Sequence, residues 1–285
     1  MQTILNAIAS AAIIAPAAVA FSLLFSLLRF ANFAVGAFIT VGAFGAWFAN
    51  TQMGWPLWTA VPVGMIAASA VVTFCDWAIF KPIRAAAGTA LLLVSVALAF
   101  VIENVLRFFL GSQIKAFDLP LSRPIDFGPV HLAPEILGVI LISGGSLALV
   151  FGCMALLPWG RAIRAAADDP DLANARGINV ARIHLLALVI GGLLIGLSGS
   201  LAGVDLAIEP GLGWTLTVPI LAAAILGGIG SMAGAVAGAI LVGLAEELSV
   251  MFLVPAYKAG VGFVVIALML LLRPQGLFGR AAIRK

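Results

Sequence analysis

The amino-acid sequence predicts an all-α integral membrane protein, a polytopic bundle of about eight or nine transmembrane helices of roughly 20 residues each. The bundle is expected to form a single transmembrane domain over residues 1–285. The chain is 63% hydrophobic and only 9% charged, and its mean hydropathy is +1.20. A soluble domain usually carries about 25% charged residues, so this chain has too few charges to cover a water-facing surface.

Nine apolar runs reach membrane length or come close to it. The first follows no positive residue and continues to Leu28, so we interpret it as a span and not as a cleaved signal peptide. The run 213–229 is short and contains Pro219, so it either crosses fully or re-enters from one side. Cys75 and Cys153 lie in apolar runs, where packing and not a disulfide is expected. The runs are residues 4–28, 33–49, 58–79, 89–110, 135–157, 185–205, 213–229, 232–254 and 258–272.

The placement of Lys and Arg predicts the orientation of the bundle, because positively charged loops stay on the cytoplasmic side. With a cytoplasmic C-terminus and alternating spans, eleven of the fifteen basic residues fall inside. This favours an N-terminus outside and a full crossing by 213–229, since a re-entrant run would reverse every earlier span. The net charge of +3 is therefore a retention signal and not a sign of nucleic-acid binding. The eleven residues are Arg29, Lys81, Arg84, Arg161, Arg164, Arg176, Arg182, Arg273, Arg280, Arg284 and Lys285.

Two connections are long, an outer loop at 111–134 and an inner loop at 158–184. The inner loop contains the signals of a short helix. Asp169 before Pro170 is typical of an N-cap followed by proline in the first turn. Gly177 fits the position just after a helix end, and Asn179 can cap the next span. We expect a helix of about two turns, roughly 10 Å long, which serves either as a docking element for a partner or as a plain connection.

The inner loop resembles the ATPase-coupling loop of the branched-chain amino acid ABC transporter permeases, the LivH and LivM proteins. Further motifs extend this resemblance over most of the chain and favour the LivH side. Val35 and the pair Glu103–Asn104 depart from the family pattern, and these departures leave the substrate open but not the family. The motifs are residues 29–36 (RFANFAVG), 160–165 (GRAIRA), 169–170 (DP) with Ala173, 177–180 (GINV), 227–234 (GGIGSMAG) and 273–279 (RPQGLFG).

The resemblance implies the permease subunit of an ATP-driven importer in the bacterial cytoplasmic (inner) membrane. It also implies a LivM-like second permease, two LivG/LivF-like ATPases that bind ATP and Mg, and a periplasmic or extracellular binding protein. No cofactor is expected in this chain. Branched-chain or other hydrophobic amino acids are the expected substrates, and urea, short amides or aromatic acids are the alternatives. The residues implied in ATPase coupling are Arg161, Arg164, Asp169, Pro170, Ala173, Gly177, Ile178 and Asn179.

Four polar residues are candidates for the translocation pathway: Asn32, Glu103, Glu246 and Glu247. A carboxylate inside a membrane span is costly and is a functional candidate by default. Adjacent helix residues point about 100° apart, so only one of Glu246 and Glu247 can face a given cavity. Glu103 and Arg107 stand at i, i+4, where a helical ion pair is expected.

Two further patterns concern packing and charge. Gly230, Gly234 and Gly238 recur every fourth residue, which on a helix makes a smooth stripe for close approach of another backbone. We interpret it as intramolecular packing, with a subunit or pathway interface as the alternative. Asp76 and Lys81, near an inner membrane edge, are expected to neutralise each other.

The motifs of several enzyme classes are absent. The chain contains no phosphate-binding Gly-x-x-x-x-Gly-Lys-Ser/Thr loop, no His-Glu-x-x-His pair and no Gly-x-Ser-x-Gly elbow. Both histidines, His131 and His184, fall in predicted loops, and no metal site is predicted. We therefore expect no enzymatic activity in this chain. A secondary transporter or channel that works without ATPase subunits is the alternative from another class.

Overall fold

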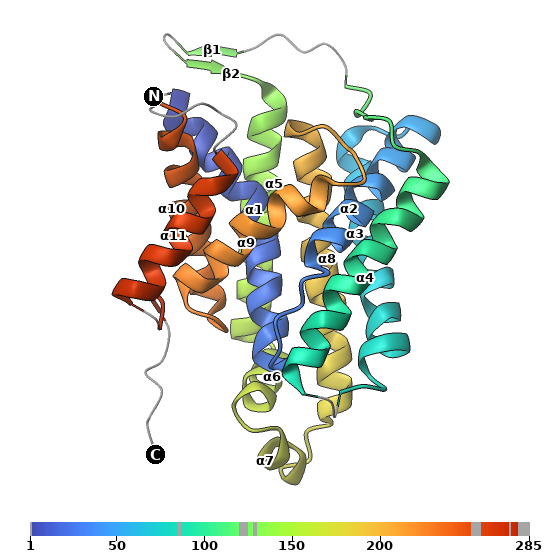
Figure 1. Ribbon diagram of the computed structural model, residues 1–285, viewed down its shortest axis with the longest axis vertical. Coiled ribbons are helices and arrows are strands. Elements are labelled where there is room, and N and C mark those ends of the chain that lie inside the picture. Colours follow the sequence, from blue (N-terminus) through green and yellow to red (C-terminus); the bar gives the residue numbers. More distant parts are fainter. Residues whose placement is uncertain are drawn as a thin grey trace.

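The computed structural model describes residues 2–84, 87–119, 125–127, 130–251, 258–273 and 275–278. The helices form one bundle, with α6 and α7 at one end and the short strands at the other (Figure 1). We call these the α7 end and the hairpin end. The elements are α1 (Gln2–Leu28), α2 (Val35–Trp47), the π-helix η1 (Phe48–Gln52), α3 (Leu57–Cys75), the π-helix η2 (Asp76–Phe80), α4 (Gly88–Leu110), β1 (Ile125–Phe127), β2 (Val130–Leu132), α5 (Pro134–Leu156), α6 (Pro158–Asp168), α7 (Pro170–Ala175), α8 (Val180–Asp205), α9 (Leu212–Gly227), α10 (Met232–Ser249) and α11 (Lys258–Leu272).

The prediction of a helical membrane bundle is confirmed. Within the described residues, six helices are long and apolar enough to cross a membrane: α1, α3 with η2, α4, α5, α8 and α10. Helices α2, α9 and α11 are apolar but shorter, so the total of eight or nine crossings depends on them. The all-α expectation has one exception, because β1 and β2 pair antiparallel in the outer loop. Residues 252–254 of the run 232–254, and the basic residues Arg280, Arg284 and Lys285, lie outside the described part of the chain.

Helix α2 begins later than the sequence predicted, because polar groups hold residues 29–34 out of helical conformation. Arg29 has a left-handed backbone (φ 57°). The Asn32 side chain accepts a hydrogen bond from the backbone N–H of Ala34 (3.0 Å), and the N–H of Phe33 donates to Ser95 Oγ on α4 (3.0 Å). These bonds satisfy backbone donors that the bilayer would leave unpaired. The chain therefore re-enters the bundle as a non-helical segment before α2 starts.

Helix α9, with its flanking turns, runs from one end of the bundle to the other. Before it, the turn between α8 and α9 lies near the hairpin end (Figure 1). In this turn, Ile208 exchanges two backbone hydrogen bonds with Lys115 (2.9 and 3.0 Å). After it, a Cβ at Gly230 would lie 3.8 Å from the Cβ of Ser26, close to the α7 end of α1. The run 213–229 thus passes through the bundle and does not return to the end where it started.

The centre of the bundle is built from small residues that let helix backbones touch. A Cβ at Gly199 on α8 would meet the carbonyl oxygen of Ile39 and, at 3.0 Å, the amide nitrogen of Ala43 on α2. A Cβ at Gly243 on α10 would lie 2.7 Å from the Ala7 carbonyl oxygen on α1. With no hydrophobic effect between helices in lipid, such close contact is the main source of their association.

Proline 16 lies inside α1 and leaves a carbonyl group without its helical partner. A proline has no N–H, so the carbonyl of Ala12, four residues earlier, loses its usual hydrogen bond. Ser143 on α5 supplies one to the Ala12 carbonyl (Oγ–O 2.6 Å), and Ser198 on α8 donates to the next carbonyl, that of Ile13 (2.6 Å). The proline therefore frees one acceptor, and the two serine bonds beside it tie α1 to α5 and α8.

The expected glycine stripe is only partly helical. Gly234 and Gly238 do face α9, where a Cβ at either position would meet the backbone of Gly227 or Ala223. Gly230 is different, because it lies in the turn before α10 with a left-handed backbone (φ 90°). The side chain of Ser231, next to it, caps α10 by accepting from the Gly234 N–H (3.1 Å). The helix prediction was therefore wrong for Gly230, because α10 begins only after its N-cap residue, Ser231.

The relative sides of the loops agree with the alternation that the basic residues predicted. The N-terminal end of α1 lies at the hairpin end (Figure 1). Phe278, close to the C-terminus, lines one pocket together with Arg164 of α6 at the α7 end. Which of the two ends faces the cytoplasm stays a prediction.

Candidate functional site

The inner loop contains two helices and not the single short one that was expected. The first, α6, is strongly amphipathic: Ile163 and Ala166 are buried, while Arg161 and Arg164 are exposed. Arg164 also donates to the carbonyl of Met154 at the end of α5 (2.9 Å). Pro158 in the first turn and the apolar residues at i, i+3 were the sequence signal for this helix.

The second helix, α7, has the caps that the sequence predicted. Asp169 Oδ1 accepts from the N–H groups of Asp171 and Leu172, both at 3.0 Å. At the other end, the Ile178 N–H donates to Ala173 O (3.0 Å) and the Gly177 N–H to Asn174 O (2.9 Å). These two bonds form a Schellman motif, which needs the left-handed conformation of Gly177 (φ 82°). Asn179 then caps α8 by accepting from the Arg182 N–H (3.1 Å).

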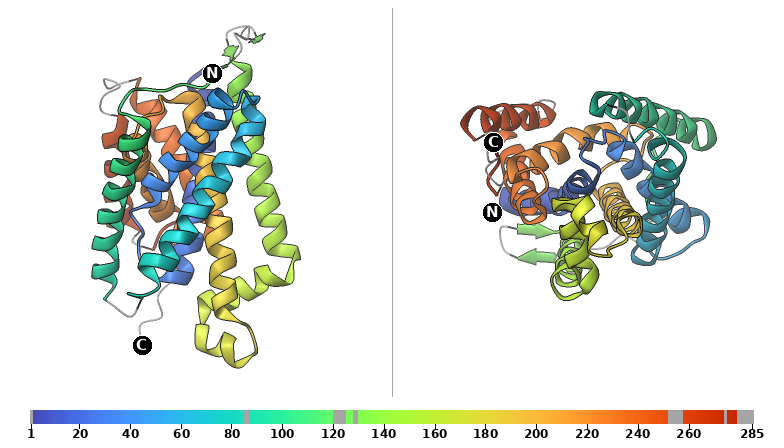
Figure 2. Two further views of the ribbon diagram at one scale, coloured as in Figure 1. Left: turned by 90° about the vertical axis from the view of Figure 1, so that its right-hand side faces the viewer. Right: turned by 90° about the horizontal axis from the view of Figure 1, so that it is seen from below.

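One side of α7 is anchored to the bundle and the other is open. Ala173 is only 3% exposed and belongs to a small apolar cluster with Leu27 of α1 and Ile163 of α6. On the opposite side, Leu172 is 55% exposed. A rigid six-residue helix with an exposed leucine is thus presented at the end of the molecule (Figure 2).

Arg29 connects the first helix to this end. Its guanidinium Nη2 lies 3.5 Å from the carbonyl oxygen of Ala167 and 3.4 Å from that of Asp168, at the C-terminal end of α6. A cation at this position complements the negative end of the helix dipole. The same residues border a pocket of about 500 Å³ between α1, α6 and the turn before α10.

A second polar cluster lies beside the α7 cap. The expected pair of Asp76 with Lys81 is wrong, because Asp76 is paired with Arg84, whose Nη2 is 2.8 Å from both carboxylate oxygens. Arg84 Nη1 also lies 3.1 Å from Nδ1 of His184. His184 was expected in a loop but is in the first turns of α8. Arg84 and His184 border a pocket of about 530 Å³ together with Gly177 and Asn179. The cluster therefore joins η2, and the turn after it, to the start of α8.

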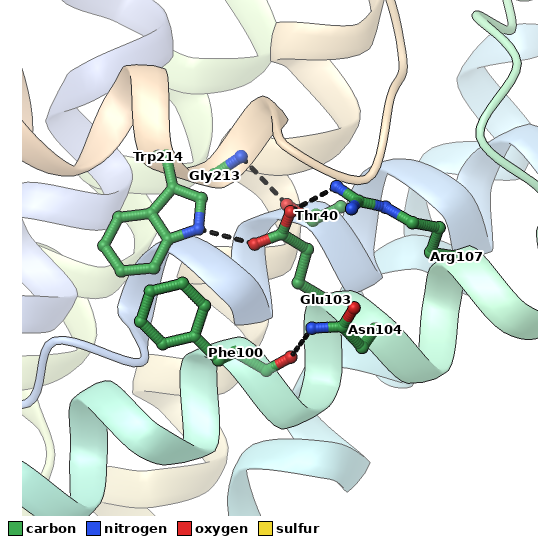
Figure 3. A network of polar contacts seen from close by, with 7 residues as sticks. All are labelled: Thr40, Phe100, Glu103, Asn104, Arg107, Gly213 and Trp214. Carbon is green, nitrogen blue, oxygen red and sulfur yellow. Dashed lines mark hydrogen bonds and ion pairs between the residues drawn. The ribbon is translucent and has the colours of Figure 1, made fainter.

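A third polar network lies between α4 and α9, closer to the hairpin end (Figure 3). The expected Glu103–Arg107 ion pair is present (Oε1–Nη2 2.6 Å). The other Glu103 oxygen, Oε2, accepts from the indole N–H of Trp214 on α9 (2.6 Å). The Trp214 ring packs on Phe100, with 5.1 Å between ring centroids. Next to Trp214, the Gly213 N–H donates to Thr40 Oγ1 on α2 (2.9 Å).

The structure separates the four pathway candidates into two groups. Asn32 and Glu103 both lie along α4: Phe33, beside Asn32, is bonded to Ser95, eight residues before Glu103. Glu246 is buried (4% exposed) on α10, one turn beyond Gly243, on the face that packs against α1. Glu247 is half-buried on the same helix. The four candidates therefore do not form one site: Asn32 and Glu103 lie along α4, and Glu246 and Glu247 lie together on α10.

The sequence alone does not single out Trp214, because its partner Glu103 is 111 residues away. The signal that could have found it is a tryptophan inside an apolar run, since a buried indole N–H needs an acceptor. Among the residues that the structure describes, no group of three His, Cys, Asp or Glu side chains converges as metal ligands.

Comparisons with known proteins identify relatives along the whole chain. The model of the family described as "branched-chain amino acid transport system / permease component" matches residues 3–272. The permease protein BraD of a high-affinity branched-chain amino acid transport system in Pseudomonas aeruginosa is 29% identical, over 100% of this chain and 97% of its own. The corresponding LivH protein of Escherichia coli K12 is 27% identical, with the same coverage.

The fold also has a counterpart among solved structures. An ABC transporter described as being of the metal-chelate type, in an inward-facing conformation, has a TM-score of 0.51 and 16% sequence identity. The match covers 95% of this chain and 85% of the other. At this identity the likeness concerns the fold alone.

Proposed function

Because the chain belongs to the family of permease components of branched-chain amino acid transport systems, we propose that it is a LivH-like subunit that imports branched-chain or other hydrophobic amino acids. As a member of this family it is a multi-pass membrane protein and the permease component of an ABC transporter. In such transporters the ATPase activity lies in separate subunits. The permease works together with those ATPases and with a substrate-binding protein.

The α7 end carries the proposal for ATPase coupling. The helix α7 is held at its base by the buried Ala173 and fixed at both ends by caps, while Leu172 remains exposed. A capped helix transmits force without fraying, because its terminal N–H and C=O groups are already bonded. The residues that contact an ATPase would be Arg161, Asp169, Pro170 and their neighbours up to Asn179.

We further propose the composition of the complete transporter. A LivM-like permease would pair with this chain, and two LivG/LivF-like ATPases, carrying ATP and Mg, would bind the α7 ends from the cytoplasm. The binding protein would deliver substrate at the hairpin end, on the outer face of the bacterial inner membrane. ATP can drive transport only if the ATPases bind the outward- and inward-open states with different affinity.

The coupling role is tested at Gly177. In Gly177→Val, the β-branched side chain strains the left-handed backbone by about 1–3 kcal/mol, which disfavours the capped α7 by roughly 5- to 150-fold. We expect the reconstituted transporter to keep basal ATP hydrolysis and lose most of its substrate uptake. Asp169→Ala, which removes the N-cap, should have the same effect to a lesser degree.

Gly177→Asn is the matched control, because asparagine tolerates the left-handed conformation. It should retain the wild-type ratio of uptake to hydrolysis. Wild-type coupling in both Gly177→Val and Asp169→Ala would remove α7 from the coupling path.

The alternative class, a carrier or channel without ATPases, makes a different prediction. Purified chain alone in proteoliposomes would then take up leucine down a gradient, and no ATPase would co-purify from native membranes. Uptake that needs ATP, and that excess leucine but not urea or acetamide inhibits, would support the amino-acid importer over its relatives for amides.

A further inference from the structure

Two opposite charges form an ion pair within a membrane helix near the hairpin end, and one of them, Arg107, is exposed. Glu103 and Arg107 lie seven and three residues before the end of α4 at Leu110, which is about 10 and 5 Å at 1.5 Å per residue. The Arg107 side chain is 48% exposed and that of Glu103 is 12% exposed. Charged groups at membrane depth face protein or water-filled space and not lipid. The two charges therefore indicate that the seam between α4 and α9 contains a polar region.

The pair leaves binding capacity on both partners. Arg107 contacts Glu103 through one terminal nitrogen, Nη2, and nearly half of its side chain is exposed. A guanidinium has further N–H donors that fit a carboxylate in bidentate geometry. The Glu103 carboxylate has about four acceptor positions, of which Arg107 and Trp214 each occupy one.

An apolar surface lies directly beside these charges. Phe100 is 52% exposed and Trp214 is 37% exposed, and their rings pack together next to the Glu103 carboxylate (Figure 3). Aromatic faces bind aliphatic side chains and also attract ammonium groups. The seam thus combines an anion, a cation and an apolar surface.

We propose that Glu103 and Arg107 form the zwitterion site of this permease, in which Glu103 binds the ammonium group and Arg107 the carboxylate of an incoming neutral α-amino acid. The aromatic pair Phe100 and Trp214 then contacts the side chain of the substrate. This proposal rests on the proposed function as an amino-acid importer and assigns the substrate class to particular residues.

The charge balance explains why a zwitterion suits this site. Without substrate, the two residues neutralise each other, so no uncompensated charge is left in the membrane. When an amino acid binds, one intrahelical ion pair is replaced by two ion pairs with the substrate. A free amino acid carries its two charges on one carbon, and residues at i, i+4 place their Cβ atoms about 5–6 Å apart. An uncharged substrate such as urea could not replace this ion pair, because it has no ammonium or carboxylate group to bind the two charges.

Trp214 acts as a positioning residue, since its indole N–H fixes one carboxylate oxygen of Glu103. This contact also defines the seam, because α4 packs its backbone mainly against α2 and reaches α9 through these side chains. Substrate that replaces the contact would release α4 from α9.

The test uses the complete transporter in proteoliposomes, with saturating binding protein and radiolabelled L-leucine. Glu103→Gln and Arg107→Gln should each lower kcat/KM for uptake by about 10- to 100-fold, the range expected for loss of a hydrogen bond to a charged group. Asn104→Ala is the matched control on the same helix: its side chain is exposed and bonds only to the Phe100 carbonyl of its own helix among the described contacts. It should change uptake by less than about twofold, as a surface substitution does.

The double variant Glu103→Gln/Arg107→Gln separates recognition from a merely structural ion pair. If the pair only stabilises α4, removing both charges should restore uptake relative to either single variant, because no unpaired charge remains. If the pair binds the zwitterion, the double variant should be at least as defective as the worse single variant. Restored uptake in the double variant, or wild-type kcat/KM in both single variants, would overturn the site.

Failure of the proposed function would look different. A wild-type complex that takes up none of the neutral amino acids would overturn both the function and the site. A complex that takes up leucine equally well with and without the two charges would overturn the site alone.

Discussion

The centre of the bundle and its helix α4 are held in place by different means. Around α1 and α8, glycines and alanines let backbones touch, as where Gly199 meets Ile39 and Gly243 meets Ala7. Helix α4 lies at the rim of the bundle (Figure 2) and is held by side chains instead: Leu91, Leu98 and Ala99 join the apolar core, and a few polar groups add hydrogen bonds. Ser95 bonds the non-helical segment before α2, and Glu103 bonds Trp214 of α9.

This difference separates a scaffold from an element that can move. Backbone packing between helices is close-fitting, so a small displacement forfeits many contacts at once. Hydrogen bonds between side chains are few and can be exchanged for bonds to a substrate or to water. A transporter needs both, since it must change state around a fixed core. We infer that α1 and α8 stay in place while α4 shifts against α9.

The largest effect is expected from a substitution in the centre of the bundle. Gly199→Val would place a branched side chain against the α2 backbone, where nothing flexible can give way. Overpacking a core typically lowers the free energy of unfolding by about 1–3 kcal/mol, occasionally by more. We expect a loss at the upper end of this range, because the new side chain would clash with backbone atoms. We expect little folded protein in detergent, measured by size-exclusion chromatography. Gly144→Ala on α5 is the control, because its Cβ would meet open space, and it should fold normally.

A smaller effect is expected where the segment before α2 meets α4. Ser95→Ala leaves the N–H of Phe33 without its acceptor, at a cost of about 1–3 kcal/mol for a buried unsatisfied donor. The protein should insert and purify, with a lower midpoint of thermal unfolding and faster hydrogen exchange in residues 29–36. Ser146→Ala, which removes only a bond to the Ser143 carbonyl within α5, should leave both quantities unchanged. Equal effects of the two serines would contradict a special role for Ser95.

The smallest effect is expected at the seam between α4 and α9. Trp214→Phe keeps an aromatic ring beside Phe100 but removes the N–H that bonds Glu103. Interhelical hydrogen bonds in membranes average about 0.6 kcal/mol and reach about 1.7, so thermal stability should fall only slightly. Spin labels on α4 and α9 should nevertheless report a broader distance distribution. A distribution as narrow as in the wild type would show that the indole bond does not restrain α4.

Local sequence patterns predicted most spans and both caps of α7. Apolar runs, Asp169–Pro170 and Gly177 are signals read within a few residues, and the structure places a helix or a cap at each of them. The sequence reasoning missed α6 as a separate helix, although its apolar spacing was visible. It also extended α10 back to Gly230, because a repeat of glycines looks helical when the cap at Ser231 is overlooked.

Partners far apart in the chain could not be predicted in the same way. Asp76 had Lys81 as its near neighbour, yet Arg84 reaches it because the chain turns back after η2. Glu103 was rightly paired with Arg107, one helical turn away, but its second partner is Trp214 of a different helix. Asn32, Glu103 and Glu246 looked alike as polar residues in apolar runs, and only the packing assigns them to different helix contacts.

The amino-acid sequence alone was enough to predict that this chain lies in a membrane, where most of its helices run, and how α7 is capped. These properties depend on transfer of side chains from water to lipid and on hydrogen bonds between near neighbours, which composition and short motifs encode. The packing of the helices was needed to show which backbones the glycines contact, which partners the carboxylates have, and that α4 is held by side chains. Those outcomes depend on the relative placement of helices, and in lipid that placement follows from close contact between surfaces distant in sequence.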